Sequence, residues 1–300
     1  MTQQHIIFVP GKNPKPEAEQ HRDFLWRTLL EGVRRADPAV YEKLSRHKAA
    51  FQLTAWNYSY YHTHKDGSRD LPWIDALINQ HGPTEKDIEE AQTTHYKLTR
   101  VMYQVIDYFP FLLKLMTGVL KSTANETRRY FRNEDDIASG IRELLKKQLR
   151  PLMQNGEKVL LIGHSLGSVI AYDTLWELSH LENLGGKVDF LTIGSPLGMS
   201  YVQHRMAGHK YTGSKRYPVN IRRWVNISAQ GDITALDRVF ADDFSEMKEL
   251  GLLESITDHC EGIYNFFRNE EGLNCHRSYG YLVNPAVGKA IADWWQESQI

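Results

Sequence analysis

One stretch of the chain, residues 159–173, constrains the fold more than any other. It reads VLLIGHSLGSVIAYD: four aliphatic residues, a Gly-x-Ser-x-Gly turn, and a segment with the composition of a helix. A short apolar run that ends in glycine is typical of a buried strand, and the residues after the second glycine can start a helix at once. The stretch therefore predicts a buried strand that turns sharply, at Ser165, into a helix.

Strands and helices alternate along much of the remaining chain. Apolar runs predict strands within residues 5–9, 49–58, 157–162, 188–193 and 221–227. Helical spacing predicts one helix that Asp136 caps and Pro151 ends, a second over residues 166–179, and a third over residues 285–296. This alternation predicts an α/β fold, with a mostly parallel sheet flanked by helices.

The span from residue 71 to residue 133 departs from this rhythm. It is long, aromatic and mostly helical in pattern, with a wide apolar face over residues 101–120. Asp107 and Lys114 lie within that stretch and argue against a membrane span, and Pro110 should kink the helix. We predict a single domain over residues 1–300, with residues 71–133 inserted as a helical cap. An equally open alternative is that the span adds to the core.

Composition excludes several classes of protein. The 300 residues include 36 Lys and Arg against 37 Asp and Glu, a net charge of −1, which gives no field to recruit nucleic acid or an anionic membrane. Two cysteines, Cys260 and Cys275, do not make a disulfide framework. The first residues lack the pattern of a secretory signal. We therefore expect a cytoplasmic protein; oligomeric state stays open.

Metal and nucleotide cofactors are not expected. His62, His64 and Asp66 resemble metal ligands, but no further ligand is evident in a chain with 13 histidines. The glycine-rich segment at residues 194–198 lacks the Lys-Ser/Thr pair of a phosphate-binding loop.

Ser165 is the candidate nucleophile. A serine on a tight turn between strand and helix exposes its hydroxyl, and Gly163 and Gly167 remove side chains that would clash there. The start of the following helix presents N–H groups to a developing oxyanion. The alternative is an ordinary glycine-flanked turn in which the serine caps a helix. His164, beside the serine, is expected to support the turn.

A serine hydroxyl needs a base, and the base needs an orienting carboxylate. Asp232 follows the predicted strand 221–227 closely, and His276 lies in the loop before the last helix. Asp237 is the first reserve for the acid. The other residues that could take these two roles are Asp242, Asp243 and Asp258 for the acid, and His259 for the base.

These motifs together resemble the α/β-hydrolase superfamily on its lipase- and esterase-like side. The matching segments are, in order, GHSLG, TIGSPLG at residues 192–198, WVNISAQGD at residues 224–232 and CHRSYGYL at residues 275–282. The resemblance implies that Ser165 is the nucleophile, His276 the general base and acid, and Asp232 the acid that orients it. It implies no metal and no organic cofactor.

The oxyanion hole is where the chain departs from that pattern. Many members of the superfamily have His-Gly after the first strand, whereas this chain has Pro10-Gly11 followed by Lys12. Proline has no N–H, so one donor should be Gly11 or Lys12. The other should be the N–H of Leu166.

The expected activity is that of a serine hydrolase acting on a small acyl ester, with a hydrophobic acyl group suggested by the apolar cap. An amide or thioester hydrolase, or an acyltransferase, could use the same residues. A hypothesis of another class is a non-catalytic α/β-hydrolase-fold protein that binds partners through residues 101–120.

Overall fold

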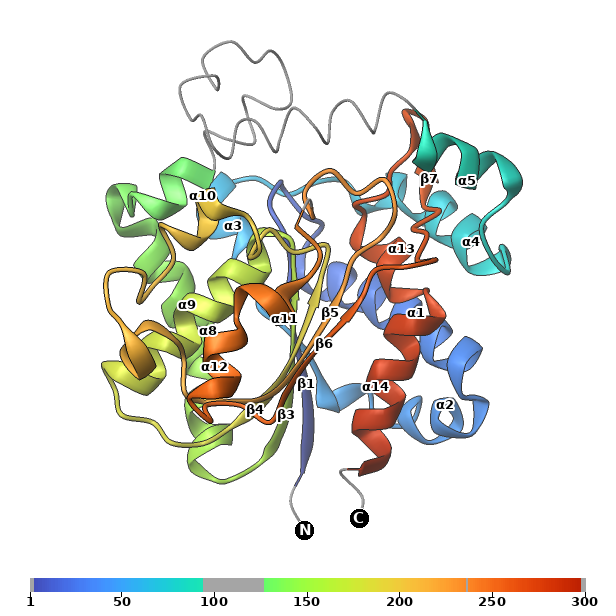
Figure 1. Ribbon diagram of the computed structural model, residues 1–300. Coiled ribbons are helices and arrows are strands. Elements are labelled where there is room, and N and C mark those ends of the chain that lie inside the picture. Colours follow the sequence, from blue (N-terminus) through green and yellow to red (C-terminus); the bar gives the residue numbers. More distant parts are fainter. Residues whose placement is uncertain (1–2, 94–126, 236, 298–300) are drawn as a thin grey trace.

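A six-stranded parallel sheet forms the centre of the computed structural model, which describes residues 3–93, 127–235 and 237–297 (Figure 1). The strand order is β2-β1-β3-β4-β5-β6, and every neighbouring pair is parallel. The strands are β1 (Gln4–Val9), β2 (Phe51–Leu53), β3 (Lys158–His164), β4 (Val188–Ile193), β5 (Ile221–Ile227) and β6 (Ser255–His259). The predicted α/β fold is confirmed.

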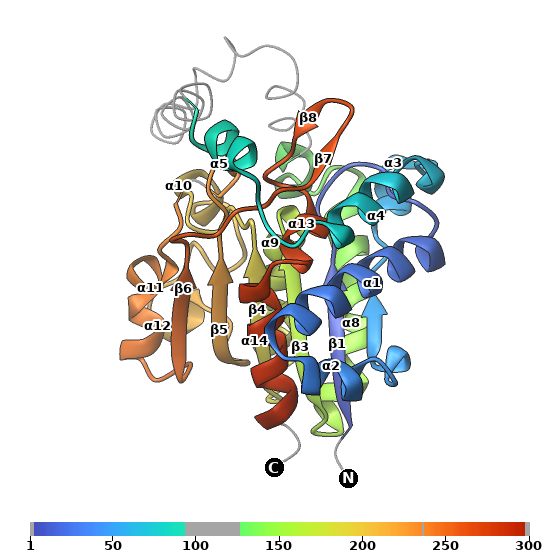
Figure 2. The ribbon, with the colours of Figure 1, turned by 90° about the vertical axis from the view of Figure 1, so that its right-hand side faces the viewer.

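Helices cover both faces of the sheet (Figures 1 and 2). The helices on one face are α1 (Ala18–Ala36), α2 (Pro38–Leu44), α13 (Ser278–Leu282) and α14 (Pro285–Glu297). Those on the other are α8 (Ile137–Gln154), α9 (Leu166–His180), α11 (Phe240–Asp243) and α12 (Ser245–Glu249). Successive strand residues alternate between the two cores, so Ile6 and Phe8 pack toward α1, and Ile7 and Val9 toward α8 and α9.

Shorter elements surround the carboxyl edge of the sheet. They are α3 (Asn57–Tyr61), α4 (Leu71–Asn79), α5 (Glu85–Gln92), α10 (Ser200–Gln203) and the two-stranded hairpin of β7 (Arg268–Asn269) and β8 (Gly272–Leu273). Ile74 and Leu77 of α4 join the core beneath α1. Residues 94–126, which hold the apolar face of the expected cap, lie outside the described residues. No helix in the described ranges is long and apolar enough to cross a bilayer.

The predicted start of α8 is confirmed, since the helix begins directly after Asp136, but its predicted end is wrong. Pro151 does not end the helix, which continues to Gln154 because a proline in the last turn removes only one hydrogen bond. Two residues after the helix, Gly156 has a φ of +67°, which allows Glu157 N–H to donate to Leu152 O at 2.9 Å and closes the helix end. Asp136 makes no capping hydrogen bond.

The cap of α8 comes from Asn133, whose Oδ1 accepts from Ser139 N–H at 2.9 Å. Elsewhere the sequence prediction missed α1 and β6 altogether. The strand predicted within residues 49–58 is β2, and it covers only Phe51–Leu53.

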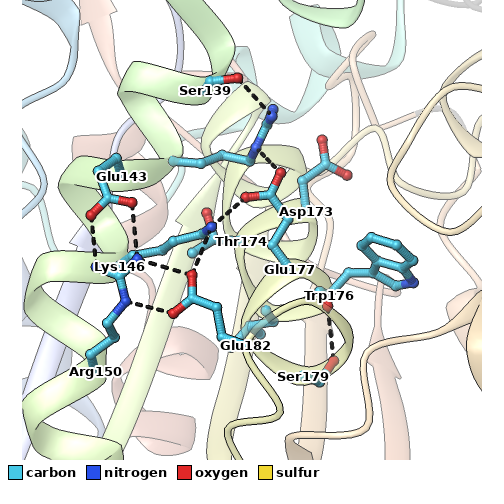
Figure 3. Close-up of polar contacts among 12 residues, drawn as sticks. Ser139, Glu143, Lys146, Arg150, Asp173, Thr174, Trp176, Glu177, Ser179 and Glu182 are labelled. Carbon is cyan, nitrogen blue, oxygen red and sulfur yellow. Dashed lines mark hydrogen bonds and ion pairs between the residues drawn. The ribbon is translucent and has the colours of Figure 1, made fainter.

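An ion-pair network joins α8 to the residues of α9 and the turn that follows it (Figure 3). Lys146 lies between Glu177, at 2.7 Å, and Glu182, at 3.0 Å. Arg142 pairs with Glu177 at 2.8 Å. Arg150 pairs with Glu182 at 2.6 Å and with Glu143 at 2.7 Å. Three cations thus meet three carboxylates between two helices.

Candidate active site

Ser165 lies where β3 passes directly into α9, and its backbone is strained. Its φ is 55° and its ψ is −130°, a conformation that residues with a side chain rarely adopt. The Ser165 N–H donates to Ile193 O at 3.2 Å, which holds the turn against the end of β4. A strained non-glycine residue that the surrounding structure fixes in this way is typical of a functional position.

Close packing around this turn explains its two flanking glycines. A Cβ atom at Gly163 would lie 2.5 Å from Ser168 Cα, and one at Gly167 would lie 2.1 Å from Val9 O. Both distances are far below van der Waals contact, so a side chain at either position would push the strand and helix apart. The loop after β1 also touches the turn, since a Cβ atom at Gly11 would lie 2.8 Å from Ser165 Cβ.

His276 and Asp232 form a hydrogen-bonded pair at the same edge of the sheet. Asp232 follows β5, His276 precedes α13, and the distance from His276 Nδ1 to Asp232 Oδ2 is 2.9 Å. The pair lies next to the end of β4, because a Cβ atom at Gly194 would lie 2.7 Å from Asp232 Oδ2 and 3.2 Å from His276 Nδ1. Gly194 follows directly on Ile193, the residue that holds Ser165 N–H.

Two hydroxyl groups fix the Asp232 carboxylate. Tyr281 Oη donates to Oδ2 at 2.6 Å, and Thr234 Oγ1 donates to Oδ1 at 2.7 Å. Thr234 Oγ1 also lies 2.6 Å from His276 Nδ1. Burial alone would raise the pKa of Asp232, but the attraction of His276 and the hydrogen bonds from His276, Tyr281 and Thr234 lower it to about 2.

The charge on Asp232 assigns the tautomer of His276. A carboxylate can only accept hydrogen bonds, so His276 Nδ1 carries the proton that it shares with Asp232. The neutral ring then has its lone pair on Nε2, where it can take a proton from a hydroxyl group. Among the described residues no hydrogen bond joins the Ser165 hydroxyl to His276, and catalytic hydrogen bonds often tighten only when substrate binds.

His164 supports the loop that carries His276. Its Nε2 lies 2.8 Å from His276 O, which can only accept, and the two rings are 4.7 Å apart. Burial and the neighbouring charges of His276 and Lys15 lower the pKa of His164 well below its usual value. His164 is therefore neutral and acts as a fixed donor to the His276 backbone.

Side chains that follow β2 hold the loop after β1 in place. Trp56 Nε1 donates to Pro10 O at 2.8 Å. Asn57 Nδ2 donates to Gly11 O at 2.8 Å and to Asn13 O at 3.0 Å. Trp56 and Asn57 are both buried, so these three carbonyl groups have fixed directions.

The two candidate oxyanion donors in this loop are fixed by the same contacts. In a planar trans peptide the N–H points opposite to the preceding C=O. The N–H of Gly11 therefore points away from Trp56, and the N–H of Lys12 away from Asn57. Leu166 opens α9, where the first N–H groups have no acceptor within the helix.

The rival acids and the rival base lie elsewhere. Asp258 accepts from Asn226 Nδ2 and from two backbone N–H groups at the start of α11. Asp237 accepts from Val239 N–H. Asp242 and Asp243 belong to α11, and His259 is an exposed residue at the end of β6. Among the described residues, none of these carboxylates hydrogen-bonds to His276.

The suggested metal ligands serve other purposes. His64 stacks on Tyr58 with ring centroids 4.6 Å apart, and Asp66 accepts from Ser68 N–H. Within the ranges that the structure describes, no group of three or more His, Cys, Asp or Glu side chains is arranged to hold a metal ion.

Comparison of the chain with models of known protein families, with curated protein sequences and with solved structures gave no match.

Sequence reasoning overlooked several side chains that build this site. Thr234 had a local signal, because Asp-x-Thr forms a turn in which the aspartate accepts from the N–H two residues on, here at 2.9 Å. Tyr281 had no local signal in the sequence, because its approach to Asp232 depends on how α13 packs. The roles of Trp56 and Asn57 likewise depend on the β1–β2 pairing.

Proposed function

We propose that this protein is a serine hydrolase of the α/β-hydrolase type, acting on a small carboxylic ester. The observation that carries the proposal is a strained, buried serine between β3 and α9, with a hydrogen-bonded Asp232–His276 pair at the same sheet edge. The two free cysteines are compatible with a reducing cytoplasm, where we place the protein.

Each residue has a defined role in the proposed reaction. Ser165 Oγ attacks the ester carbonyl carbon while its proton passes to His276 Nε2. The tetrahedral oxyanion takes hydrogen bonds from Leu166 N–H and from Gly11 or Lys12 N–H. The carbonyl re-forms, and His276 gives the proton to the departing alkoxide, leaving an acyl-serine.

Water completes the cycle. His276 takes a proton from the water molecule that attacks the acyl-serine, and Ser165 recovers its proton as the acid leaves. Throughout, the ionised Asp232 stabilises the imidazolium that forms twice per cycle. Tyr281 and Thr234 hold that carboxylate in position, so we assign them a positioning role.

The test is hydrolysis of a series of 4-nitrophenyl esters from acetate to decanoate, with an amide and a thioester of the same acyl group alongside. We expect the wild type to release nitrophenol, and Ser165→Ala to lose at least about a thousandfold in kcat/KM. Ser179→Ala, in the last turn of the same helix, is the matched control and should keep full activity. A folded wild type that hydrolyses none of these substrates would contradict the proposal.

A further inference from the structure

A second feature of the carboxyl edge is a small cavity beside the Ser165 turn. It lies between the loop after β1, the start of α1 and the loop after β2, with a volume of about 130 Å³. Its polar lining comes from Lys15, His21, Asn57 and His64, and its apolar lining includes Pro16 and Leu53. Since one water molecule occupies roughly 30 Å³ in the liquid, the cavity has room for a carboxylate or phosphate group.

The charges around this cavity are unbalanced. The charged groups that act most strongly on the Lys15 ammonium are, in decreasing order, Arg277, Asp70, Lys65 and Lys12, of which Asp70 is the carboxylate. Asp70 is already paired with Lys65 and with Arg277, both at 2.6 Å. Cations thus outnumber acids among the groups that act on Lys15. Burial, followed by the charge of Arg277, lowers the pKa of Lys15 to about 7.

The remaining polar groups of the lining also favour an anion. Lys15 Nζ donates to Lys12 O at 2.7 Å, which leaves two further N–H bonds on the ammonium. His21 is 2% exposed, and no hydrogen bond from a described residue uses its ring. Pro16 and Ala18 bring the beginning of α1, a helix of 19 residues, to the cavity wall, and the N-terminal end of a helix attracts negative charge.

The cavity is close to the proposed reaction centre. Lys15 is joined through Lys12 O to the loop whose Gly11 touches Ser165. Lys15 also lowers the pKa of His164, the neighbour of Ser165. A group bound here would therefore lie at the same carboxyl edge of the sheet as Ser165, the edge at which open α/β sheets bind ligands.

We propose that this cavity is an anion-binding site, with Lys15 and His21 as its principal ligands, for the carboxylate or phosphate group of a small molecule. The inference does not depend on catalysis. Where the proposed function also holds, the site selects substrates whose acyl or alcohol portion carries such a group.

Binding is tested first in Ser165→Ala protein, so that the result is independent of turnover. Isothermal titration with sodium phosphate and with sodium succinate, at an ionic strength held constant with chloride, should show saturable binding at one site for at least one of the two anions. Lys15→Met should weaken it at least tenfold. Lys43→Met, which removes an exposed lysine of α2, should leave it unchanged.

A second pair of variants guards against misfolding of Lys15→Met. Ala55 lines the cavity but is exposed, so Ala55→Glu adds a negative charge without disturbing the core, and Ala55→Gln is its neutral match. We expect weaker anion binding in Ala55→Glu alone. The site is refuted if neither anion binds saturably, or if Lys15→Met and Ala55→Glu both bind like the parent.

Substrate selection is measured separately in active protein, with the 4-nitrophenyl monoester of succinic acid against 4-nitrophenyl butyrate. We expect Lys15→Met to lower kcat/KM for the charged ester at least tenfold more than for the neutral one. Anion binding without this difference in kcat/KM would mean that the site binds anions but does not select the substrate.

Discussion

Two charged clusters in this protein differ in their balance. Between α8 and the end of α9, three cations face three carboxylates at distances of 2.6–3.0 Å (Figure 3). Beside the Ser165 turn, the charges that act most strongly on Lys15 are three further cations against the carboxylate of Asp70. The first cluster is balanced within the fold, and the second favours a negative charge from outside.

The two regions also differ in backbone geometry. The α8–α9 network links regular helices, so its effect should be confined to stability. The carboxyl edge combines a strained Ser165 with a buried carboxylate, Asp232, which accepts hydrogen bonds from His276, Tyr281 and Thr234. Polar groups there position one another, which is costly for stability and useful for chemistry. The predictions below test this division, from the largest effect to the smallest.

Replacing Asp232 by asparagine should have the largest effect. An asparagine amide at this position cannot hold His276 in the tautomer that leaves Nε2 free, so kcat should fall by roughly three to four orders of magnitude. Asp237→Asn, the alternative acid, should change kcat by less than about threefold, since among the described residues Asp237 does not hydrogen-bond to His276. Steady-state ester hydrolysis measures both, and the reverse ranking would move the acid to Asp237.

The buried Asp232 should also make the protein acid-sensitive. Its pKa is about 2 in the folded protein against 3.8 for an unperturbed aspartate, so its contribution to stability is present above pH 4 and is lost as the pH falls toward 2. The shift corresponds to about 2 kcal/mol. Urea unfolding between pH 5 and pH 2 should therefore show a steeper loss in wild type than in Asp232→Asn.

Glu182 is a second carboxylate with a lowered pKa, and its salt dependence can be compared with that of Asp232. Hydrogen bonds from Arg150, offset in part by burial, and the charge of Lys146 lower its pKa to about 2 as well. It is more exposed than Asp232, so salt should screen its contribution. In about 0.5 M NaCl, the difference in free energy of unfolding between wild type and Glu182→Gln should shrink. The difference between wild type and Asp232→Asn should persist. Equal salt sensitivity would contradict the contrast.

Tyr281→Phe should reduce kcat about tenfold, because the hydroxyl orients Asp232 Oδ2 from 2.6 Å. It should also cost about 1 kcal/mol of stability, since Ala229 N–H loses its acceptor. Tyr279→Phe is the matched control: both rings are buried, but the Tyr279 hydroxyl has no hydrogen-bond partner among the described residues. Equal effects of the two changes would remove Tyr281 from its positioning role.

Lys146→Met should affect stability alone, by about 1 kcal/mol. The loss is small because Glu177 keeps Arg142 and Glu182 keeps Arg150. Thermal unfolding and ester hydrolysis on the same preparation check this, and a change of more than about twofold in kcat would show that the network reaches the site.

The sequence predicted the strands best where apolar runs are unbroken. Residues 5–9 lie in β1 and residues 158–162 in β3, as expected, because a run of apolar residues buried on both faces of a sheet has a strong local signal. β6 was missed because its sequence, SITDH, is short and polar at the sheet edge. Pro151 was a misleading stop signal, because α8 continues to Gln154 and the turn at Gly156 follows it.

The site residues, like the strands, could be predicted where a local sequence pattern marks them. Ser165, Asp232 and His276 could be selected from the sequence because each lies next to a recognisable strand or helix. Tyr281, Asn57 and Lys15 could not, because their contacts join segments far apart in the chain: Tyr281 reaches Asp232, and Asn57 reaches Gly11. Such contacts depend on packing that local patterns do not encode.

Covalent labelling with a fluorophosphonate probe tests the central claim most directly. The probe reacts with a serine only where a base and oxyanion donors activate it. Intact-mass analysis followed by peptide mapping should find a single adduct on Ser165 in folded wild type, and none in Ser165→Ala. Folded wild type that stays unlabelled, or that carries the adduct on another serine, would contradict the account.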